Sequence, residues 1–252
     1  MENITDDTSV AFEWSEKSVE KGVRNRLFSV SGPAKRPVYG AIWSPENSLP
    51  NKPLVLLGHG ASGDCFQAPV VSMAYRMVRH FGFHAAAIDG PVHGRRQKDS
   101  GGRTAFLEEW RRPETVDEMI ADWQITISSL QSQSEIGCGP LAYWGLSMGT
   151  IYGAPLVASD LPIKAAVLGL MGLTGPTEHY RNQIQAAAEA ITCPVLFLIQ
   201  LEDELFPRAP CFALFDALAS EYKTLHANPG LHSSVPREEL KYSEQFLAHY
   251  LS

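Results

Sequence analysis

The sequence predicts an α/β fold, with a mostly parallel sheet of about eight strands and helices on both of its faces. Continuous apolar runs such as residues 53–58 and Val195–Gln200 are typical of strands that are buried on both faces of a parallel sheet. Segments with apolar residues at helical spacing alternate with these runs along the chain. Such alternation is what crossover connections between parallel strands require.

The first half of the chain supplies a hairpin and the first crossover. Gly32-Pro33 separates two short β-rich runs, which favours an antiparallel pair. Apolar residues recur at helical spacing in the first helix, as at Val70, Met73 and Met77. We expect these elements in order: strands at residues 27–30, 38–43 and 53–58, a helix at 68–81, a strand at 84–88, a long polar loop at 89–112, and a helix that begins near Glu114.

The second half continues the same alternation. Its strands are apolar and short, and its helices lie between them. The expected strands are residues 141–144, 165–170, 195–200 and 222–227, and the expected helices are residues 178–190, 208–220 and 236–251.

The length of 252 residues fits one large domain. We expect an N-terminal extension at residues 1–25 and a single domain at residues 26–252. Residues 171–193 form a short excursion between two strands and hold only about one helix. The sequence therefore predicts little or no lid over a site at this edge of the sheet.

Composition excludes several classes of protein. Hydrophobic residues make up 44% and charged residues 19%, and no apolar run approaches the roughly 20 residues that span a bilayer. A net charge of −7 disfavours nucleic acid and anionic membranes as partners. The acidic, polar start of the chain lacks the features of a signal peptide, so we expect a cytoplasmic protein.

The cysteines are scattered and form no C-x-x-C pair. This pattern argues against a zinc site and against a disulfide framework. Plain packing in the interior is the expected role of these thiols, and we expect no metal. The four cysteines are Cys65, Cys138, Cys193 and Cys211.

The run Gly145–Gly149 is a G-x-S-x-G sequence directly after an apolar strand. In that context it predicts a nucleophile elbow, a sharp strand-to-helix turn that exposes the hydroxyl of Ser147. Flanking glycines leave room for the strained turn, because a Cβ atom at either position would crowd it.

A serine hydroxyl needs a general base and an orienting acid, and both follow in the chain. Asp203 lies in the acidic loop after strand 195–200 and is the preferred acid, with Glu202 as its rival. His232 follows the next strand in a turn-rich loop, where it can reach across the strand ends. The other histidines nearest to such a position are His59, His93 and His179.

Two backbone N–H groups are expected to form an oxyanion hole. Met148 supplies one, directly after the nucleophile, and Ala61 in the glycine-rich loop after strand 53–58 supplies the other. The helix that begins at Met148 adds its positive end to the same site. We expect His59 to brace this loop.

These motifs together resemble the α/β-hydrolase superfamily, and within it the compact dienelactone-hydrolase-like and prolyl-oligopeptidase-like serine esterases. The resemblance covers roughly residues 26 to 251. It implies the α/β-hydrolase fold, and it implies that residues 89–94 form a structural loop in which Asp89 and His93 have no catalytic role. The nucleophile here is serine, whereas dienelactone hydrolase uses cysteine. The motifs that carry the resemblance are His59-Gly60, residues 89–94, the Ser147 elbow, Asp203 with Pro207, and Gly230-x-His232.

The expected activity is hydrolysis of carboxylic esters with small to medium acyl groups through an acyl-enzyme intermediate, with no cofactor. The partner is then a small-molecule ester. The sequence leaves both a monomer and a homodimer open. An amidase, a peptidase, or a lactone or carbon–carbon bond hydrolase could use the same residues, and a non-catalytic binding protein could keep the fold. The expected walls of the substrate pocket are Phe66, Gln67, Trp110, Leu173, Tyr180 and Phe206.

Overall fold

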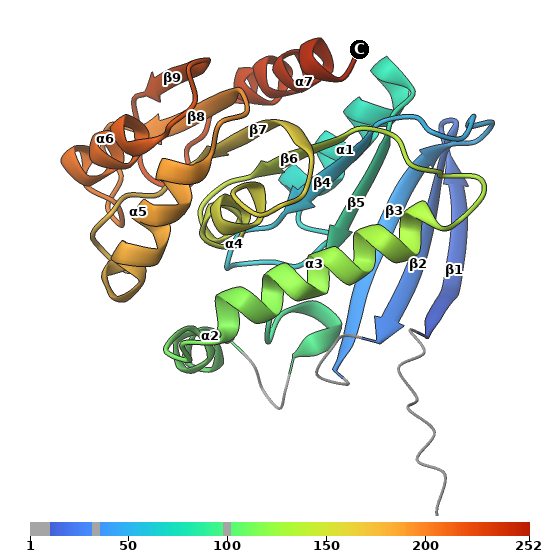
Figure 1. Cartoon of the computed structure of the whole chain (residues 1–252), viewed down its shortest axis with the longest axis horizontal. Coiled ribbons are helices and arrows are strands. Elements are labelled where there is room, and N and C mark those ends of the chain that lie inside the picture. Colours follow the sequence, from blue (N-terminus) through green and yellow to red (C-terminus); the bar gives the residue numbers. More distant parts are fainter. Residues whose placement is uncertain (1–10, 32–35, 98–101) are drawn as a thin grey trace, which may run out of the picture.

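The computed structural model describes residues 11–31, 36–97 and 102–252, without the side chains of residues 102–104. A nine-stranded sheet runs through the molecule in the order β1-β2-β3-β5-β4-β6-β7-β8-β9 (Figure 1). Its strands are β1 (Phe12–Glu20), β2 (Val23–Ser31), β3 (Pro37–Pro45), β4 (Leu54–Gly58), β5 (His84–Ile88), β6 (Leu141–Gly145), β7 (Ile163–Gly169), β8 (Val195–Gln200) and β9 (Lys223–Asn228).

The sheet has an antiparallel part and a parallel part. Strand β2 pairs antiparallel with both β1 and β3, and β3 pairs antiparallel with β5. From β5 to β9 every pairing is parallel. The expected α/β class with a mostly parallel sheet is confirmed. Carboxyl ends of the parallel strands consequently meet at one edge, where loops of distant sequence come together.

Helices cover both faces of the sheet (Figure 1). Helices α1 and α7 contact each other and pack on one face, while α3, α4, α5 and α6 belong to the apolar cluster on the other. The α-helices are α1 (Ala68–Phe81), α2 (Gly102–Trp110), α3 (Thr115–Gln131), α4 (Met148–Val157), α5 (Arg181–Ala190), α6 (Arg208–Ala217) and α7 (Glu238–Leu251). Two short 3₁₀ turns are η1 (Gly94–Arg96) and η2 (Glu178–Tyr180).

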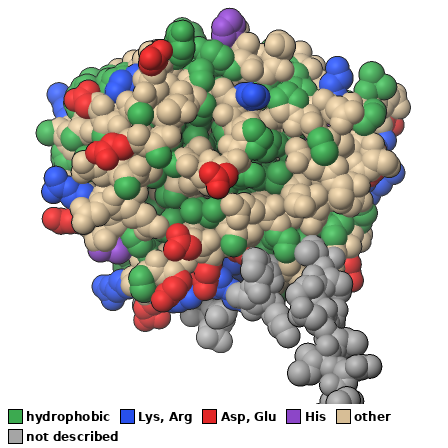
Figure 2. All heavy atoms as spheres, viewed as in Figure 1, with side chains coloured by type: hydrophobic (Ala, Val, Ile, Leu, Met, Phe, Trp, Pro, Cys, Tyr) green, Lys and Arg blue, Asp and Glu red, His purple; other side chains and the backbone are tan. Residues whose placement is uncertain are grey.

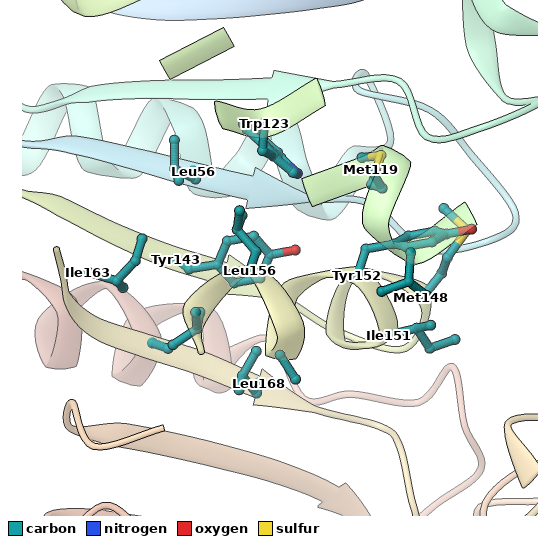
Figure 3. Packing of buried hydrophobic residues seen from close by; sticks show 14 of the residues in the cluster. Leu56, Met119, Trp123, Tyr143, Met148, Ile151, Tyr152, Leu156, Ile163 and Leu168 are labelled. Carbon is teal, nitrogen blue, oxygen red and sulfur yellow. The ribbon is translucent and has the colours of Figure 1, made fainter. Parts of the chain in front are cut away.

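The larger core lies under α3 and α4 (Figure 3). Leu56 and Tyr143 come from the sheet, and Trp123 and Leu156 come from the two helices; all four are almost fully buried. Helix α4 is buried along its whole length, which explains why its residues are apolar on every side. The nucleophile candidate at its start is therefore held by a well-packed element.

Two elements differ from the sequence expectations. The sheet begins at β1, inside the stretch expected to be an N-terminal extension, so it has nine strands where about eight were expected. Strand β1 lies at the sheet edge and is mostly exposed, so it lacks the apolar pattern of a buried strand. Residues 89–112, expected to be one polar loop, contain η1 and α2.

The excursion at residues 171–193 holds η2 and α5, close to the single helix expected there. In the part of the chain that the structure describes, every helix is too short or too polar to cross a membrane. Acidic and basic side chains lie interspersed on the face shown in Figure 2.

Candidate active site

Ser147 occupies a strained turn between β6 and α4. Its backbone has φ 57° and ψ −119°, a region that residues with a side chain rarely adopt. The Ser147 N–H donates to the carbonyl of Gly169 on the neighbouring strand, at 3.0 Å. A Cβ atom on Gly149 would lie 2.7 Å from the carbonyl oxygen of Gly58, so the turn packs directly on the β4 backbone.

Two buried hydroxyls stabilise this turn. Thr150 Oγ1 accepts the N–H of Gly169 at 2.8 Å and lies 2.9 Å from the carbonyl oxygen of Gly145. Tyr143 donates its hydroxyl to the carbonyl of Gly149 at 2.6 Å. Hydrogen bonds of this kind offset the cost of the strained serine.

His232 lies between the serine and an acid. Its Nε2 is 2.9 Å from Ser147 Oγ, and its Nδ1 is 2.7 Å from Asp203 Oδ2. Because a carboxylate accepts at Nδ1, that nitrogen carries the proton, and Nε2 presents a lone pair to the serine hydroxyl. The ring can therefore receive a proton from Ser147.

Asp203 is fixed by the loop that carries it. Its side chain is 1% exposed, and its Oδ1 accepts the N–H groups of Leu205 at 2.8 Å and Phe206 at 2.9 Å. These bonds leave Oδ2 directed at His232. The carboxylate thus has both oxygens engaged in a single orientation.

The rival acid Glu202 faces away from the imidazole. Its carboxylate pairs with Arg208 at 2.9 Å and accepts the N–H of Gly230. Glu204, in the same loop, accepts the backbone N–H of His232 at 2.8 Å. The two flanking glutamates hold the loop of His232, and Asp203 alone of the three contacts its ring.

Ala61 and Met148 both line the cavity beside Ser147. Neither backbone N–H has a hydrogen-bond acceptor among the described residues. Met148 is also the first residue of α4, so its N–H lies at the positive end of that helix. Two unpaired donors beside a nucleophile are the arrangement that binds a developing oxyanion.

His59 holds the loop that carries Ala61. Its Nε2 accepts the N–H of Gly90 at 2.8 Å, so its Nδ1 carries the proton and donates to the carbonyl of Gly60, also at 2.8 Å. Burial lowers the pKa of His59 to about 4, which keeps the ring neutral near pH 7. This placement agrees with the bracing role expected from the sequence.

The other histidines near the site contact backbone carbonyls. His93 lies 2.7 Å from the carbonyl oxygen of Pro91 and 3.1 Å from that of Ala61, and His179 lies 2.9 Å from that of Trp110. Asp89 is buried and accepts the N–H groups of Cys65 and Arg95. None of these three side chains contacts Ser147 in the described structure.

A cavity of about 800 Å³ opens beside Ser147. Its wall is mostly apolar and comes from six regions: the loops after β4, β5 and β7, helix α2, the start of α4, and the loop of Asp203. Lining side chains beyond Ser147 and the two N–H donors include Val92, His93, Phe106, Leu107, Trp110, Ile151, Pro176, Leu205 and Phe206. Among the described residues, no cluster of His, Cys, Asp and Glu could hold a metal ion.

The structure places Trp110 and Phe206, two of the expected pocket residues, in this wall. The other four lie outside it. Phe66 packs against the edge of Trp43, and Gln67 accepts the N–H of Gly60. Leu173 and Tyr180 are buried in the core cluster.

Several residues of the cavity wall were not predicted from the sequence. Ile151 lies one helical turn after Ser147, so the i, i+4 spacing could have identified it. Phe106 and Leu107 lie on α2, which was expected to be loop. Their position depends on how α2 docks, and sequence spacing carries no signal for that.

Comparisons with known proteins agree with this architecture. The chain is similar to the solved structure of a PEG-bound cold-adapted esterase from an Arctic intertidal metagenomic library, at 36% sequence identity and a TM-score of 0.85. That alignment covers 95% of this chain and 100% of the other. No protein-family model and no curated protein matches the chain.

A more distant structure shares the fold. It is an acetyl xylan esterase from Paenibacillus sp. R4, at 19% identity and a TM-score of 0.73, with 96% of this chain and 89% of that chain covered. Because the first relative is more than one-third identical over nearly the whole length, the chain belongs to the α/β-hydrolase superfamily.

Proposed function

We propose that the chain is a serine carboxylic-ester hydrolase that cleaves esters of small to medium acyl groups through an acyl-enzyme intermediate. One observation carries the proposal: the His232 ring bridges the Ser147 hydroxyl and the Asp203 carboxylate in the wall of an apolar cavity. Similarity to a cold-adapted esterase supports the choice of ester hydrolysis.

The contacts allow a complete proton balance. As Ser147 Oγ attacks the ester carbonyl, Nε2 of His232 takes its proton, and Asp203 stabilises the imidazolium through Nδ1–H. The carbonyl oxygen becomes an oxyanion and accepts from the N–H groups of Ala61 and Met148. When the tetrahedral intermediate collapses, His232 returns the proton to the leaving alcohol. Water then attacks the acyl-enzyme with His232 again as base, which frees the acid and Ser147.

Other reactions on the same residues differ in the bond that breaks. An amidase, a peptidase, or a lactone or carbon–carbon bond hydrolase would use the same nucleophile and base. A binding protein without chemistry would not need an unpaired pair of N–H donors beside a serine that contacts an imidazole. A panel of esters, lactones and anilides separates these alternatives.

The central test is turnover of a short-chain p-nitrophenyl ester together with labelling by a fluorophosphonate. We expect Ser147→Ala to lose the label and to lower kcat by about 10⁴-fold to 10⁶-fold. Ser159→Ala, a hydroxyl deletion at the far end of α4, is the matched control and should keep full activity. Absence of both turnover and labelling in the wild-type protein would refute the proposal.

A second pair of variants tests the acid. Asp203→Asn should lower kcat by about 10⁴-fold, because the imidazole loses the acceptor that fixes its tautomer. Glu202→Gln should change kcat little, since Glu202 contacts Arg208 and Gly230. Equal losses in the two variants would contradict the assignment of Asp203.

A further inference from the structure

The cavity has one aromatic wall. Phe106 and Trp110 of α2 stack with ring centroids 5.1 Å apart and an interplanar angle of 26°, and both line the cavity. The edge-on ring of His93 lies 5.3 Å from Phe106 and extends this wall toward the loop of Ala61, here called the oxyanion loop. Aromatic surfaces of this kind bind flat apolar groups by stacked or edge-to-face contacts.

The mechanism decides which part of an ester meets this wall. His232 returns a proton to the leaving alcohol, so the alcohol oxygen must lie on the His232 side of Ser147. Phe206 packs against the His232 ring, with centroids 5.7 Å apart, and so borders that side. The acyl group therefore points away from His232, into the cavity that α2 and Ile151 help to line.

The charged side chains in the described cavity wall are of one sign. Asp64 is the only residue among the described lining residues with a carboxylate, and no described lining residue is Lys or Arg. Asp64 Oδ1 accepts the N–H of Phe66 at 2.8 Å, which holds its side chain on the oxyanion loop. A second carboxylate brought into this cavity would be repelled.

Two arginines in the loop after β5, which also supplies lining residues, are already paired. Arg96 lies 2.7 Å from Asp122, with both side chains nearly buried. Arg95 donates to the carbonyl of Gly40 and lies over the ring of Tyr39. Both guanidinium groups thus have partners within the protein, and neither arginine lines the cavity.

We infer that this site selects esters whose acyl group is uncharged and carries a ring-sized apolar body, and that Asp64 disfavours acyl groups with a free carboxylate. The inference rests on the proposed ester hydrolysis and adds the class of acyl group. Trp110 and Phe106 recognise the apolar body, and Asp64 supplies the discrimination by charge.

The test measures kcat/KM by proton release on methyl esters of four acids: acetate, 3-phenylpropanoate, hexanoate, and adipate with its second carboxylate free. The wild-type protein should prefer 3-phenylpropanoate over acetate, and hexanoate over the adipate half-ester by about tenfold or more. A preference for the adipate half-ester would overturn the inference. Hydrolysis of acetate that is lost in Ser147→Ala would leave the proposed function standing in that case.

Variants separate the two parts of the inference. Asp64→Asn keeps the acceptor for Phe66 and should raise the ratio of kcat/KM for the adipate half-ester to that for hexanoate about threefold to tenfold. Glu221→Gln is the matched control, because it removes an exposed charge. Glu221 lies beside the start of β9, whereas Asp64 follows the carboxyl end of β4. Equal effects of the two variants would show a general charge effect and contradict the role of Asp64.

The aromatic wall is tested by Trp110→Leu. We expect the ratio of 3-phenylpropanoate to acetate turnover to fall about tenfold. Trp14→Leu, on edge strand β1, is the control and should leave the ratio unchanged. If Trp110→Leu does not fold, Leu107→Ala replaces it, since Leu107 lines the cavity but is 37% exposed. An unchanged ratio in the folded wall variant would overturn the role of α2.

Discussion

At the scale of single residues, Ser147 combines a hydroxyl that contacts an imidazole with a strained backbone. A side chain at φ 57° and ψ −119° costs about 1–3 kcal/mol, and the buried hydrogen bonds of Thr150 and Tyr143 hold it there. Ser147 was predictable because its G-x-S-x-G motif follows a buried strand. Gly145 and Gly149 leave room for the unusual dihedral angles of Ser147.

This strain predicts a difference in stability between two variants of Ser147. Ser147→Gly should unfold at a higher denaturant concentration than Ser147→Ala, by about 1 kcal/mol in the free energy of unfolding, because glycine adopts these angles without strain. Both variants lack the hydroxyl, so the comparison isolates the backbone term. Equal stabilities of the two, measured by urea unfolding, would show that the turn stores no strain.

His59 offers a second prediction at this scale. The Gly60 carbonyl that accepts from Nδ1 belongs to the same trans peptide as the Ala61 N–H, so the imidazole also directs that N–H toward the cavity. His59→Ala should lower kcat about tenfold to hundredfold with a smaller change in KM, since only the transition state uses this donor. His84→Ala is the control: another buried histidine, the first residue of β5, whose loss should reduce stability and leave kcat nearly unchanged.

At the scale of elements, α2 depends on the excursion between β7 and β8. The Tyr180 hydroxyl donates to the carbonyl of Arg112 at 2.9 Å and also contacts that of Trp110, the last residue of α2. Tyr180→Phe should therefore lower the free energy of unfolding by about 1 kcal/mol and raise KM for esters with a bulky acyl group. Tyr242→Phe, an exposed tyrosine on α7, should change neither quantity. Steady-state kinetics with a bulky ester and with an acetate ester would reveal whether α2 is held in this way.

The buried strands could be predicted from the sequence, whereas helix α2 could not. Strands β4, β6 and β8 were predictable because two-sided burial makes them continuously apolar. Ser147, Asp203 and His232 follow β6, β8 and β9, whose carboxyl ends lie on the same side of the sheet. Helix α2 is short and its apolar residues define no strong apolar face, so its local pattern resembles a loop. Its fold depends on contacts with residues far away in sequence, which a local pattern does not record.

At the scale of the whole molecule, two buried histidines link stability to pH. Burial lowers the pKa of His59 and of His84 to about 4 in the folded protein, from 6.5 for a free histidine. As pH falls below about 6.5, the unfolded chain takes up protons that the folded protein does not accept. The stability present above pH 6.5 is therefore lost progressively as pH approaches 4.

Each histidine should account for roughly 3 kcal/mol of this loss, because one unit of pKa difference is worth about 1.4 kcal/mol. Urea unfolding followed between about pH 7 and pH 4 measures it. His84→Gln should flatten the decline by about half of the histidine share, because glutamine cannot be protonated in this range and the β5 position then titrates in neither state. His249→Gln, an exposed site on α7, is the control and should leave the curve unchanged. A decline of the same steepness in His84→Gln would mean that the neutral buried imidazole of His84 contributes nothing to acid unfolding.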